Sequence, residues 1–298
     1  MPLNHKSPTK VGTLDTRIQV TSFMEDLDRM IWAETMSLTT YGVRVAIKVS
    51  RKGALARILP CLPPGWKRSQ SRKADRTYSF ILGEDQPGGE NHRTLLYADR
   101  SLIARAAKTA RAIESFESDL KLFVAETAPR AVFVHAGVVA WNGKAVVIPG
   151  RSFSGKTTLV AALVRAGAAY YSDEYAVLDA RGRVHHYARP LAIRENGRFE
   201  QPTRYQVETL GGRSGEKPLP VGLVIVTRFK PGARWRPRRM SEGEGALALM
   251  ANTVSARRAP EAMLKSVRRV VSSATVLKSD RGDVDQVVDF VREEMVLR

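Results

Sequence analysis

The chain contains Gly150-Arg151-Ser152-Phe153-Ser154-Gly155-Lys156-Thr157-Thr158, hereafter the glycine loop, and this stretch predicts the fold around it. It satisfies the pattern of a glycine, any four residues, and then Gly-Lys-Ser/Thr. Residues 144–149 before it form a short β-branched run, which is typical of a buried strand. Residues 158–166 after it place apolar side chains at helical spacing, and Gly167 follows as a stop. The sequence therefore predicts a strand, a glycine-rich turn and a helix in succession.

A turn of this kind at the start of a helix can hold a phosphate group. Glycines let the backbone approach an anion, while successive N–H groups and the positive end of the helix dipole point at it. Lys156 is expected to reach the β- and γ-phosphates of ATP, and Thr157 to offer its hydroxyl to Mg²⁺. An ordinary glycine turn is the alternative, because with glycine at ~7% of residues the bare pattern arises on the order of once per hundred chains of this length. We expect all nine residues of the glycine loop to line the ATP site.

Cysteine content and hydropathy indicate the compartment. Among 298 residues there is one cysteine, Cys61, so no internal disulfide can form, and the chain fits a reducing compartment. Cys61 is expected to be a small buried residue rather than a nucleophile. No apolar run approaches the length of a membrane span, and the first residues lack the apolar core of a signal peptide. These features predict a cytoplasmic protein without a membrane partner.

The charge balance bears on partners. Lys and Arg number 48 against 30 Asp and Glu, a net charge of +18, and the excess collects in residues 44–76, 228–239 and 257–269. Such patches suit an acidic partner, nucleic acid, or simply solvated basic faces, and part of the charge would attract ATP. No nucleic-acid module is visible, and the patches lack regularly interleaved aromatic residues. The sequence therefore argues against nucleic acid as the partner.

The first half of the chain predicts a small α+β module after a loose tail of residues 1–15. The module covers residues 16–128. Its predicted elements are a short strand followed by a helix over 24–32, strands over 41–49, 77–82 and 93–98, a short helix over 53–62, and a long connecting helix over 101–128. Pro129 ends that helix and marks the predicted domain boundary.

The second half, residues 129–298, predicts an α/β domain because strands alternate with helices. Residues 131–140 form a strand, and Asn142-Gly143 predicts a hairpin back into the strand that feeds the glycine loop. Residues 194–220 are polar and glycine-rich, as in a functional loop or lid. Further strands are expected over 168–171, 175–178, 184–187, 221–228 and 274–278, and helices over 243–253, 260–273 and 284–295.

Two acidic residues and a histidine complete the candidate site. Asp173 and Glu174 follow a short strand one helix after Lys156, and in a parallel α/β unit both segments open on the same edge of the sheet. A carboxylate there can hold Mg²⁺ or accept the proton of an attacking hydroxyl, although a solvated strand end is the alternative. His135 lies in the strand that pairs with the one before the glycine loop, where a buried structural histidine is the alternative. Arg189 is a weaker candidate for a phosphate contact, with a surface ion pair as the alternative.

Residues 135–174 carry a family resemblance. His135-Ala-Gly-Val-Val, the glycine loop with the strand before it, and Leu163-Val-Arg-Ala-Gly-Ala-Ala-Tyr-Tyr-Ser-Asp173-Glu174 together resemble the catalytic domain of HPr kinase/phosphorylase. That family is similar in core fold to phosphoenolpyruvate carboxykinase. The resemblance covers residues 131–193 well and continues more weakly to the end of the chain. It implies a P-loop kinase domain of this type.

The resemblance also implies an activity and a set of roles. The activity is transfer of phosphate from ATP to a serine hydroxyl of a protein or peptide, an acceptor that the positive charge of the chain would suit if acidic. Lys156 falls on the phosphate lysine, Thr157 on the Mg²⁺ ligand, Asp173 on a residue for metal binding and base chemistry, and His135 on an active-site histidine. Glu174 stands where the family has a second aspartate. A small-molecule kinase and a regulatory ATPase remain open, as does a homo-oligomeric state.

Overall fold

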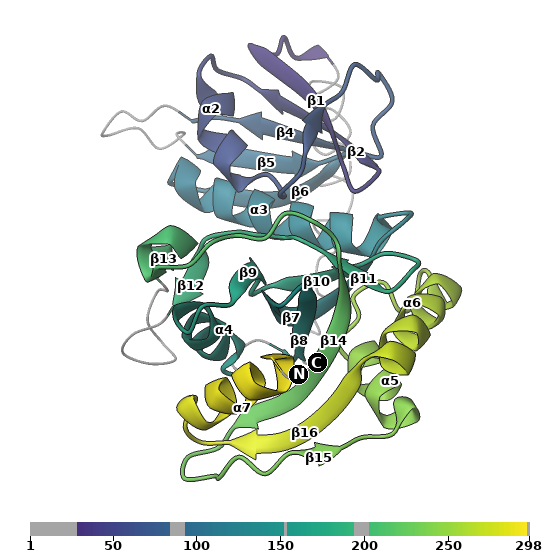
Figure 1. Cartoon of the computed structure of the whole chain (residues 1–298). Coiled ribbons are helices and arrows are strands. Elements are labelled where there is room, and N and C mark those ends of the chain that lie inside the picture. Colours follow the sequence, from purple (N-terminus) through teal and green to yellow (C-terminus); the bar gives the residue numbers. More distant parts are fainter. Residues whose placement is uncertain (1–28, 84–92, 152–153, 194–202, 297–298) are drawn as a thin grey trace, which may run out of the picture. The chain divides into compact units, whose positions relative to one another are not determined.

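The computed structural model describes residues 29–83, 93–151, 154–193 and 203–296 and shows a mixed α/β protein with several mixed sheets (Figure 1). The described residues divide into two compact units. The first comprises the segments up to Ser37, Val45–Pro60 and Arg72–Phe116, and the second comprises Leu38–Arg44, Cys61–Ser71 and the chain from Glu117 onward. The predicted tail lies outside the described residues, as do residues 24–28 of the first predicted helix. Of the remaining residues of that helix, 29–32, only Arg29 is helical.

A six-stranded mixed sheet takes up most of the N-terminal half, with strand order β3-β1-β2-β4-β5-β6. Its strands are β1 (Glu34–Thr40), β2 (Val43–Val49), β3 (Lys67–Arg68), β4 (Arg76–Ile81), β5 (Thr94–Ala98) and β6 (Ser101–Ala106). The helical segments are α2 (Ala54–Ile58), the 3₁₀ turn η1 (Leu59–Cys61) and α3 (Thr109–Thr127). Alternate residues of β2 are buried, as expected for a strand with one face on a core.

One helix prediction in this half is wrong at its start. Residues 101–106, expected to be helical, form β6 and pair antiparallel with β5, and α3 begins only at Thr109. The reason is the turn between the two strands, where Asp99 has a left-handed φ of 53° and its carboxylate accepts a hydrogen bond from the Thr77 N–H at 2.8 Å. Cross-strand pairing thus overrides the helical spacing of the apolar residues. The sequence also gave no indication of β1.

The second unit is built on an eight-stranded mixed sheet with the path β11-β10-β7-β8-β14-β16-β15, and β9 pairs with β7 beside β10. Its strands are β7 (Val132–Trp141), β8 (Lys144–Pro149), β9 (Ala169–Ser172), β10 (Tyr175–Leu178), β11 (Arg183–His185), β14 (Leu219–Phe229), β15 (Arg238–Arg239) and β16 (Thr275–Arg281). The helices are α4 (Lys156–Arg165), α5 (Glu242–Met250), α6 (Pro260–Ser273) and α7 (Asp285–Val296). A separate ladder joins β12 (Leu191–Ile193) to β13 (Thr203–Tyr205), and a 3₁₀ turn η2 (Val207–Leu210) follows.

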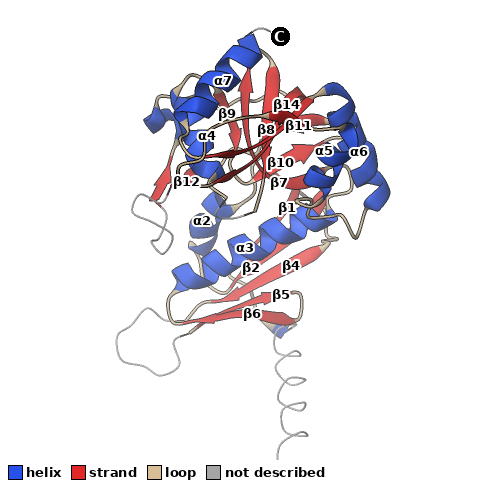
Figure 2. Ribbon diagram, turned by 90° about the horizontal axis from the view of Figure 1, so that it is seen from below, coloured by secondary structure: helices blue, strands red, loops and turns tan. Residues whose placement is uncertain are grey.

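Helices cover both faces of this sheet (Figure 2), and its central strands β7 and β8 are accordingly apolar except for His135 and Lys144. Val138 and Val147 belong to the core beneath α5 and α6, whereas their neighbours Val139 and Val146 belong to the core beneath α4 and α7. This alternation follows from the two-residue period of a strand. The predicted helices over 243–253, 260–273 and 284–295 correspond to α5, α6 and α7.

The predicted hairpin at Asn142-Gly143 is confirmed. Both residues have positive φ, 47° and 74°, as a two-residue type I′ turn requires, and they join β7 to β8 in antiparallel register. The prediction of a parallel sheet holds only in part. Strand β14 runs parallel to β8 and β16, whereas β7 is antiparallel to its neighbours. Of the polar stretch 194–220, residues 194–202 lie outside the described residues.

No helix of the described residues is both long and apolar enough to cross a membrane.

Gly137 of β7 lets α4 pack directly on the sheet. A Cβ at this position would lie 2.5 Å from Val160 Cγ2 and 3.8 Å from Lys156 Cβ. We predict that Gly137→Ala lowers the free energy of unfolding by about 1–3 kcal/mol, because α4 must move away from β7. The matched control is Gly243→Ala in α5, where the added Cβ meets open space. We expect this substitution to raise the free energy of unfolding by up to about 1 kcal/mol. Urea denaturation measures both, and an equal effect of the two substitutions would contradict this packing.

Candidate functional site

The glycine loop is tied to β7 at its start. Strand β8 ends at Pro149, and the Gly150 N–H then donates to the His135 carbonyl at 3.0 Å. Within the loop the Ser154 N–H donates to the Arg151 carbonyl at 3.3 Å. A Cβ on Gly150 would lie 2.8 Å from Ser154 Oγ, so a larger residue here would displace that hydroxyl. Ser152 and Phe153 lie outside the described residues, and Arg151 is exposed.

The N terminus of α4 is open to an anion. Gly155 precedes the helix with a left-handed φ of 80°, no side chain caps the helix, and its first turn contains no acidic residue. Its first N–H groups therefore have no partner within the helix, and the dipole adds partial positive charge there. The Ser154 hydroxyl is buried and has no hydrogen-bond partner among the described residues. This arrangement fits a bound phosphate.

Lys156 and Thr157 are the first two residues of α4, and their side chains contact the glycine loop and Asp173 respectively. Lys156 Nζ donates to the Arg151 carbonyl at 2.8 Å, so the ammonium group lies over the loop rather than in the core. Burial lowers the pKa of Lys156, and the negative charge of Asp173 opposes this. The Thr157 hydroxyl donates to Asp173 Oδ2 at 3.3 Å. Thr158 is exposed on the first turn.

Asp173 and Glu174 directly follow the end of β9 at Ser172, as predicted, and β10 begins immediately after them at Tyr175. Strand β9 pairs with Val138–Ala140 of β7 and β10 pairs with Val132–His135, so the acidic pair interrupts one line of pairing along β7. Because β8 and β9 are both antiparallel to β7, they run in the same direction, so the glycine loop and the acidic pair follow strand ends at the same edge of the sheet, as predicted. The Ala136 N–H donates to the Glu174 carbonyl at 3.3 Å, which holds the acidic pair beside β7.

The environment of Asp173 makes it a stronger base than a solvent-exposed carboxylate. Burial raises its pKa and the charge of Glu174 raises it further, while the hydroxyls of Tyr170 and Thr157 act in the opposite direction. The Tyr170 hydroxyl lies 3.1 Å from Asp173 Oδ1 and 2.8 Å from the Arg189 carbonyl oxygen. Asp173 is thus held in place by hydroxyls on both oxygens.

His135 lies beside this pair on β7. Its ring centroid is 4.9 Å from that of Tyr175. Burial lowers the pKa of His135, and the positive charge of Lys156 lowers it further, although Glu174 opposes this. The imidazole is therefore neutral near pH 7. All four predicted catalytic residues, His135, Lys156, Asp173 and Glu174, lie around one short stretch of β7.

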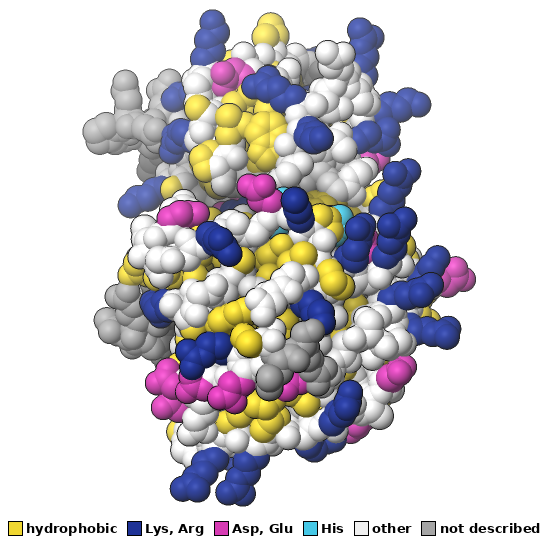
Figure 3. All heavy atoms as spheres, viewed as in Figure 1, with side chains coloured by type: hydrophobic (Ala, Val, Ile, Leu, Met, Phe, Trp, Pro, Cys, Tyr) yellow, Lys and Arg dark blue, Asp and Glu magenta, His cyan; other side chains and the backbone are white. Residues whose placement is uncertain are grey.

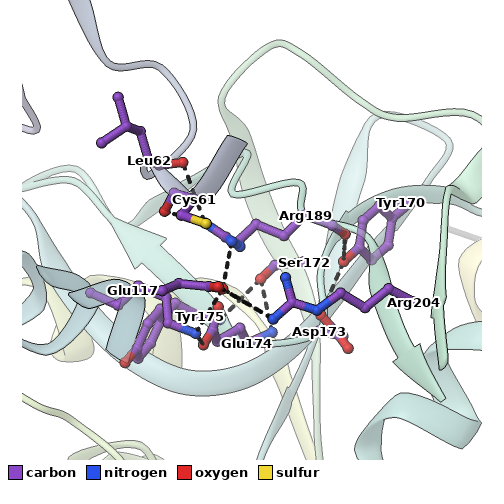
Figure 4. Close-up of polar contacts among 11 residues, drawn as sticks. Cys61, Leu62, Glu117, Tyr170, Ser172, Asp173, Glu174, Tyr175, Arg189 and Arg204 are labelled. Atoms are coloured by element: carbon purple, nitrogen blue, oxygen red, sulfur yellow. Dashed lines mark hydrogen bonds and ion pairs between the residues drawn. The ribbon is translucent and has the colours of Figure 1, made fainter. Parts of the chain in front are cut away.

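A buried ionic cluster within the second unit orients Glu174, and the sequence did not reveal it (Figure 4). Lys121 of α3 contacts Glu174 at 2.5 Å and lies 3.7 Å from Glu117 on the same helix. Glu117 pairs with Arg189 at 2.6 Å and with Arg204 of β13 at 3.3 Å. Glu117 and Lys121 are four residues apart on α3, a spacing that brings two side chains together on a helix. This spacing is the one feature of the sequence that indicates part of the cluster.

Two predictions about this region need correction. Arg189 is neither a phosphate contact nor a surface ion pair, because only 8% of its side chain is exposed and its guanidinium binds Glu117 and the carbonyls of Cys61 and Leu62. Cys61 is partly exposed rather than buried. Burial and the charge of Glu117 raise the pKa of its thiol, so it is a weak nucleophile.

The described residues contain no group of three or more His, Cys, Asp or Glu side chains able to hold a metal ion. The Thr157 hydroxyl and the Asp173 carboxylate are nevertheless the hard oxygen ligands that Mg²⁺ prefers. Mg²⁺ binds through one or two protein groups and keeps several water molecules or phosphate oxygens. This pair therefore fits Mg²⁺ accompanied by a phosphate ligand.

Positive charge is not confined to this region. On the face drawn in Figure 3, Lys and Arg side chains are scattered singly and in small groups, with acidic side chains between them. That face therefore offers no continuous basic stripe of the kind that tracks a nucleic-acid backbone.

No protein-family model matches the chain, and no curated protein is similar to it in sequence. The chemistry of the site therefore rests on its own residues.

Glu117 neutralises the charge of Arg189 in a buried pair, in which the side chains are 7% and 8% exposed respectively. We predict that Glu117→Gln lowers the free energy of unfolding by about 3 kcal/mol, since it leaves a buried cation without a counter-charge. The control is Glu114→Gln on the same helix, which breaks an exposed pair with Arg111 and costs less than about 1 kcal/mol. Chemical denaturation compares them, and equal losses would show that the buried pair has no special weight.

Proposed function

We propose that the chain is an ATP-dependent phosphotransferase that moves the γ-phosphate of ATP to the hydroxyl of a serine, or of a similar side chain, in a protein or peptide. The proposal includes the finer description of the second unit as a P-loop kinase domain of the HPr kinase and phosphoenolpyruvate carboxykinase type. Its support is the site geometry together with the resemblance of residues 131–193.

The observation that carries the proposal is the 3.3 Å contact between Thr157 and Asp173. It joins the first turn of the helix that follows the glycine loop to a carboxylate sixteen residues later. A phosphate bound to the N–H groups of α4 would therefore have a proton acceptor, the Asp173 carboxylate, close to it. Binding and base chemistry are otherwise separate features of the sequence, and this contact unites them.

The residues divide the reaction between them. The backbone N–H groups and Lys156 hold the β- and γ-phosphates and balance charge that develops on them. Asp173 accepts the proton of the acceptor hydroxyl as its oxygen forms a bond to the γ-phosphorus, and the bond from that phosphorus to the bridging oxygen breaks to release ADP. Glu174, fixed by Lys121, keeps negative charge beside Asp173 and so sustains its basicity.

Mg²⁺, when bound, would screen the phosphate charges and help to align the transferred group. Thr157 and Asp173 are the two residues that would hold it. His135, as a neutral imidazole, can donate one hydrogen bond toward the same space and accept another.

A polypeptide acceptor is favoured by the family resemblance, and the net charge of +18 suits an acidic one. A small-molecule kinase would use the same residues on a different hydroxyl. A regulatory ATPase would use them on water and release free phosphate. Intact-mass measurement of proteins incubated with the enzyme and ATP identifies the first activity, because only that one adds phosphate to a polypeptide. Release of free phosphate without any phosphorylated product identifies the ATPase.

We predict that Asp173→Asn retains ATP binding but lowers the rate of transfer by about 10²–10⁴-fold, since loss of a positioned base has this effect. Asparagine preserves shape and hydrogen bonding but accepts no proton. Transfer of labelled γ-phosphate to acceptors in a native lysate measures the rate. The matched control is Asp289→Asn, which removes an exposed carboxylate on α7 and leaves the rate unchanged. Wild-type transfer by Asp173→Asn would overturn the assignment of the base.

A further inference from the structure

Arg281 is a buried arginine directly beneath the glycine loop. It is the last residue of β16, is 1% exposed, and ranks among the largest fully buried side chains of the described residues. Its Nη2 donates to the Gly155 carbonyl at 2.6 Å. Parallel strands β8, β14 and β16 place Arg281 and the glycine loop at the same edge of the sheet. No sequence pattern singled this residue out.

The charge of Arg281 has no carboxylate partner among the described residues. Its Nε is buried without an acceptor, and the Phe229 ring, with its centroid 5.8 Å from Cζ, provides only a weak cation–π contact. Neighbouring Asp280 pairs instead with Arg228, whose side chain is exposed. Burial alone lowers the pKa of Arg281, with no opposing carboxylate.

A buried unpaired cation is costly, and an apolar residue of similar size would often be neutral or stabilising in its place. The fold of the isolated chain therefore gives no reason for an arginine at this position. A bound polyanion on the other side of the loop would give one, because its negative charge would compensate the cation across a few ångströms of low-dielectric protein.

The Arg281 guanidinium packs tightly against Gly155. Its φ of 80° is left-handed, and a Cβ there would lie 2.3 Å from Arg281 Nη2. The guanidinium thus occupies the space that glycine leaves free and binds the carbonyl of the same residue. The same carbonyl also accepts the Leu159 N–H of α4 at 3.2 Å, so the guanidinium and the helix together fix the peptide unit of Gly155. In a trans peptide the Lys156 N–H of that unit points away from the carbonyl.

We propose that Arg281 is a positioning residue of the phosphate site, which fixes Gly155 so that the N–H groups of α4 face the triphosphate and supplies a positive charge that the triphosphate compensates. This inference rests on the proposed function, because it requires that the glycine loop binds ATP. It extends that function by making ATP affinity depend on a side chain that the nucleotide does not touch.

The test measures two quantities in wild type, Arg281→Met and Arg281→Lys: the melting temperature without nucleotide and the Kd for Mg-ATP from calorimetric titration. For Arg281→Met we expect an unchanged or higher melting temperature together with Mg-ATP binding about tenfold weaker. Arg281→Lys keeps the charge but lacks the fork, so its affinity lies between those two values. The control is Arg228→Met, an exposed arginine whose loss leaves both quantities unchanged.

A purely structural role predicts the reverse pattern, a lower melting temperature with unchanged affinity, and that result would overturn the inference. If Arg281→Met does not fold, Arg281→Lys decides, and wild-type affinity in that variant also overturns it. If the wild-type protein itself binds no Mg-ATP, the proposed function fails and this inference with it. Wild-type binding that survives Arg281→Met refutes the inference alone.

Discussion

The arrangement of the site depends on β7, whose backbone is shared between the glycine loop and the acidic pair. The His135 carbonyl accepts the Gly150 N–H, and the next residue along, Ala136, donates its N–H to the Glu174 carbonyl. These two backbone hydrogen bonds, of 3.0 and 3.3 Å, tie both segments to one strand. Anion-binding groups and carboxylates therefore face each other without any long flexible connection between them.

Charge is distributed around this strand in two different ways. On the acidic side Glu117 pairs with Arg189 and Lys121 pairs with Glu174, while the Asp173 carboxylate contacts hydroxyls. Beneath the glycine loop, Arg281 contacts a carbonyl and an aromatic ring but no carboxylate among the described residues. The ion pair with Lys121 holds Glu174 in place without any ligand. The unpaired charge of Arg281 instead leaves a positive potential at the loop, which a bound anion can neutralise.

Local features of the sequence predicted much of the fold and the centre of the site. The Asn142-Gly143 turn, the strand before Gly150 and the helix after Gly155 depend on neighbours in the chain, and all three are present. Residues 101–106 were predicted wrongly because pairing with β5 outweighs helical spacing. Glu117, Arg204 and Arg281 could not be predicted as site residues, since Glu117 lies 72 residues from Arg189 and 87 from Arg204, and Arg281 lies 126 residues from Gly155.

The most direct test of the account is a calorimetric titration of the wild-type protein with ATP and with adenosine, each in the presence of Mg²⁺. The account places the binding groups on the phosphates, so it predicts saturable binding of Mg-ATP at one site and no measurable binding of adenosine at the same concentrations. Absence of Mg-ATP binding, or equal affinity for adenosine, would contradict the central claim that the glycine loop holds a triphosphate.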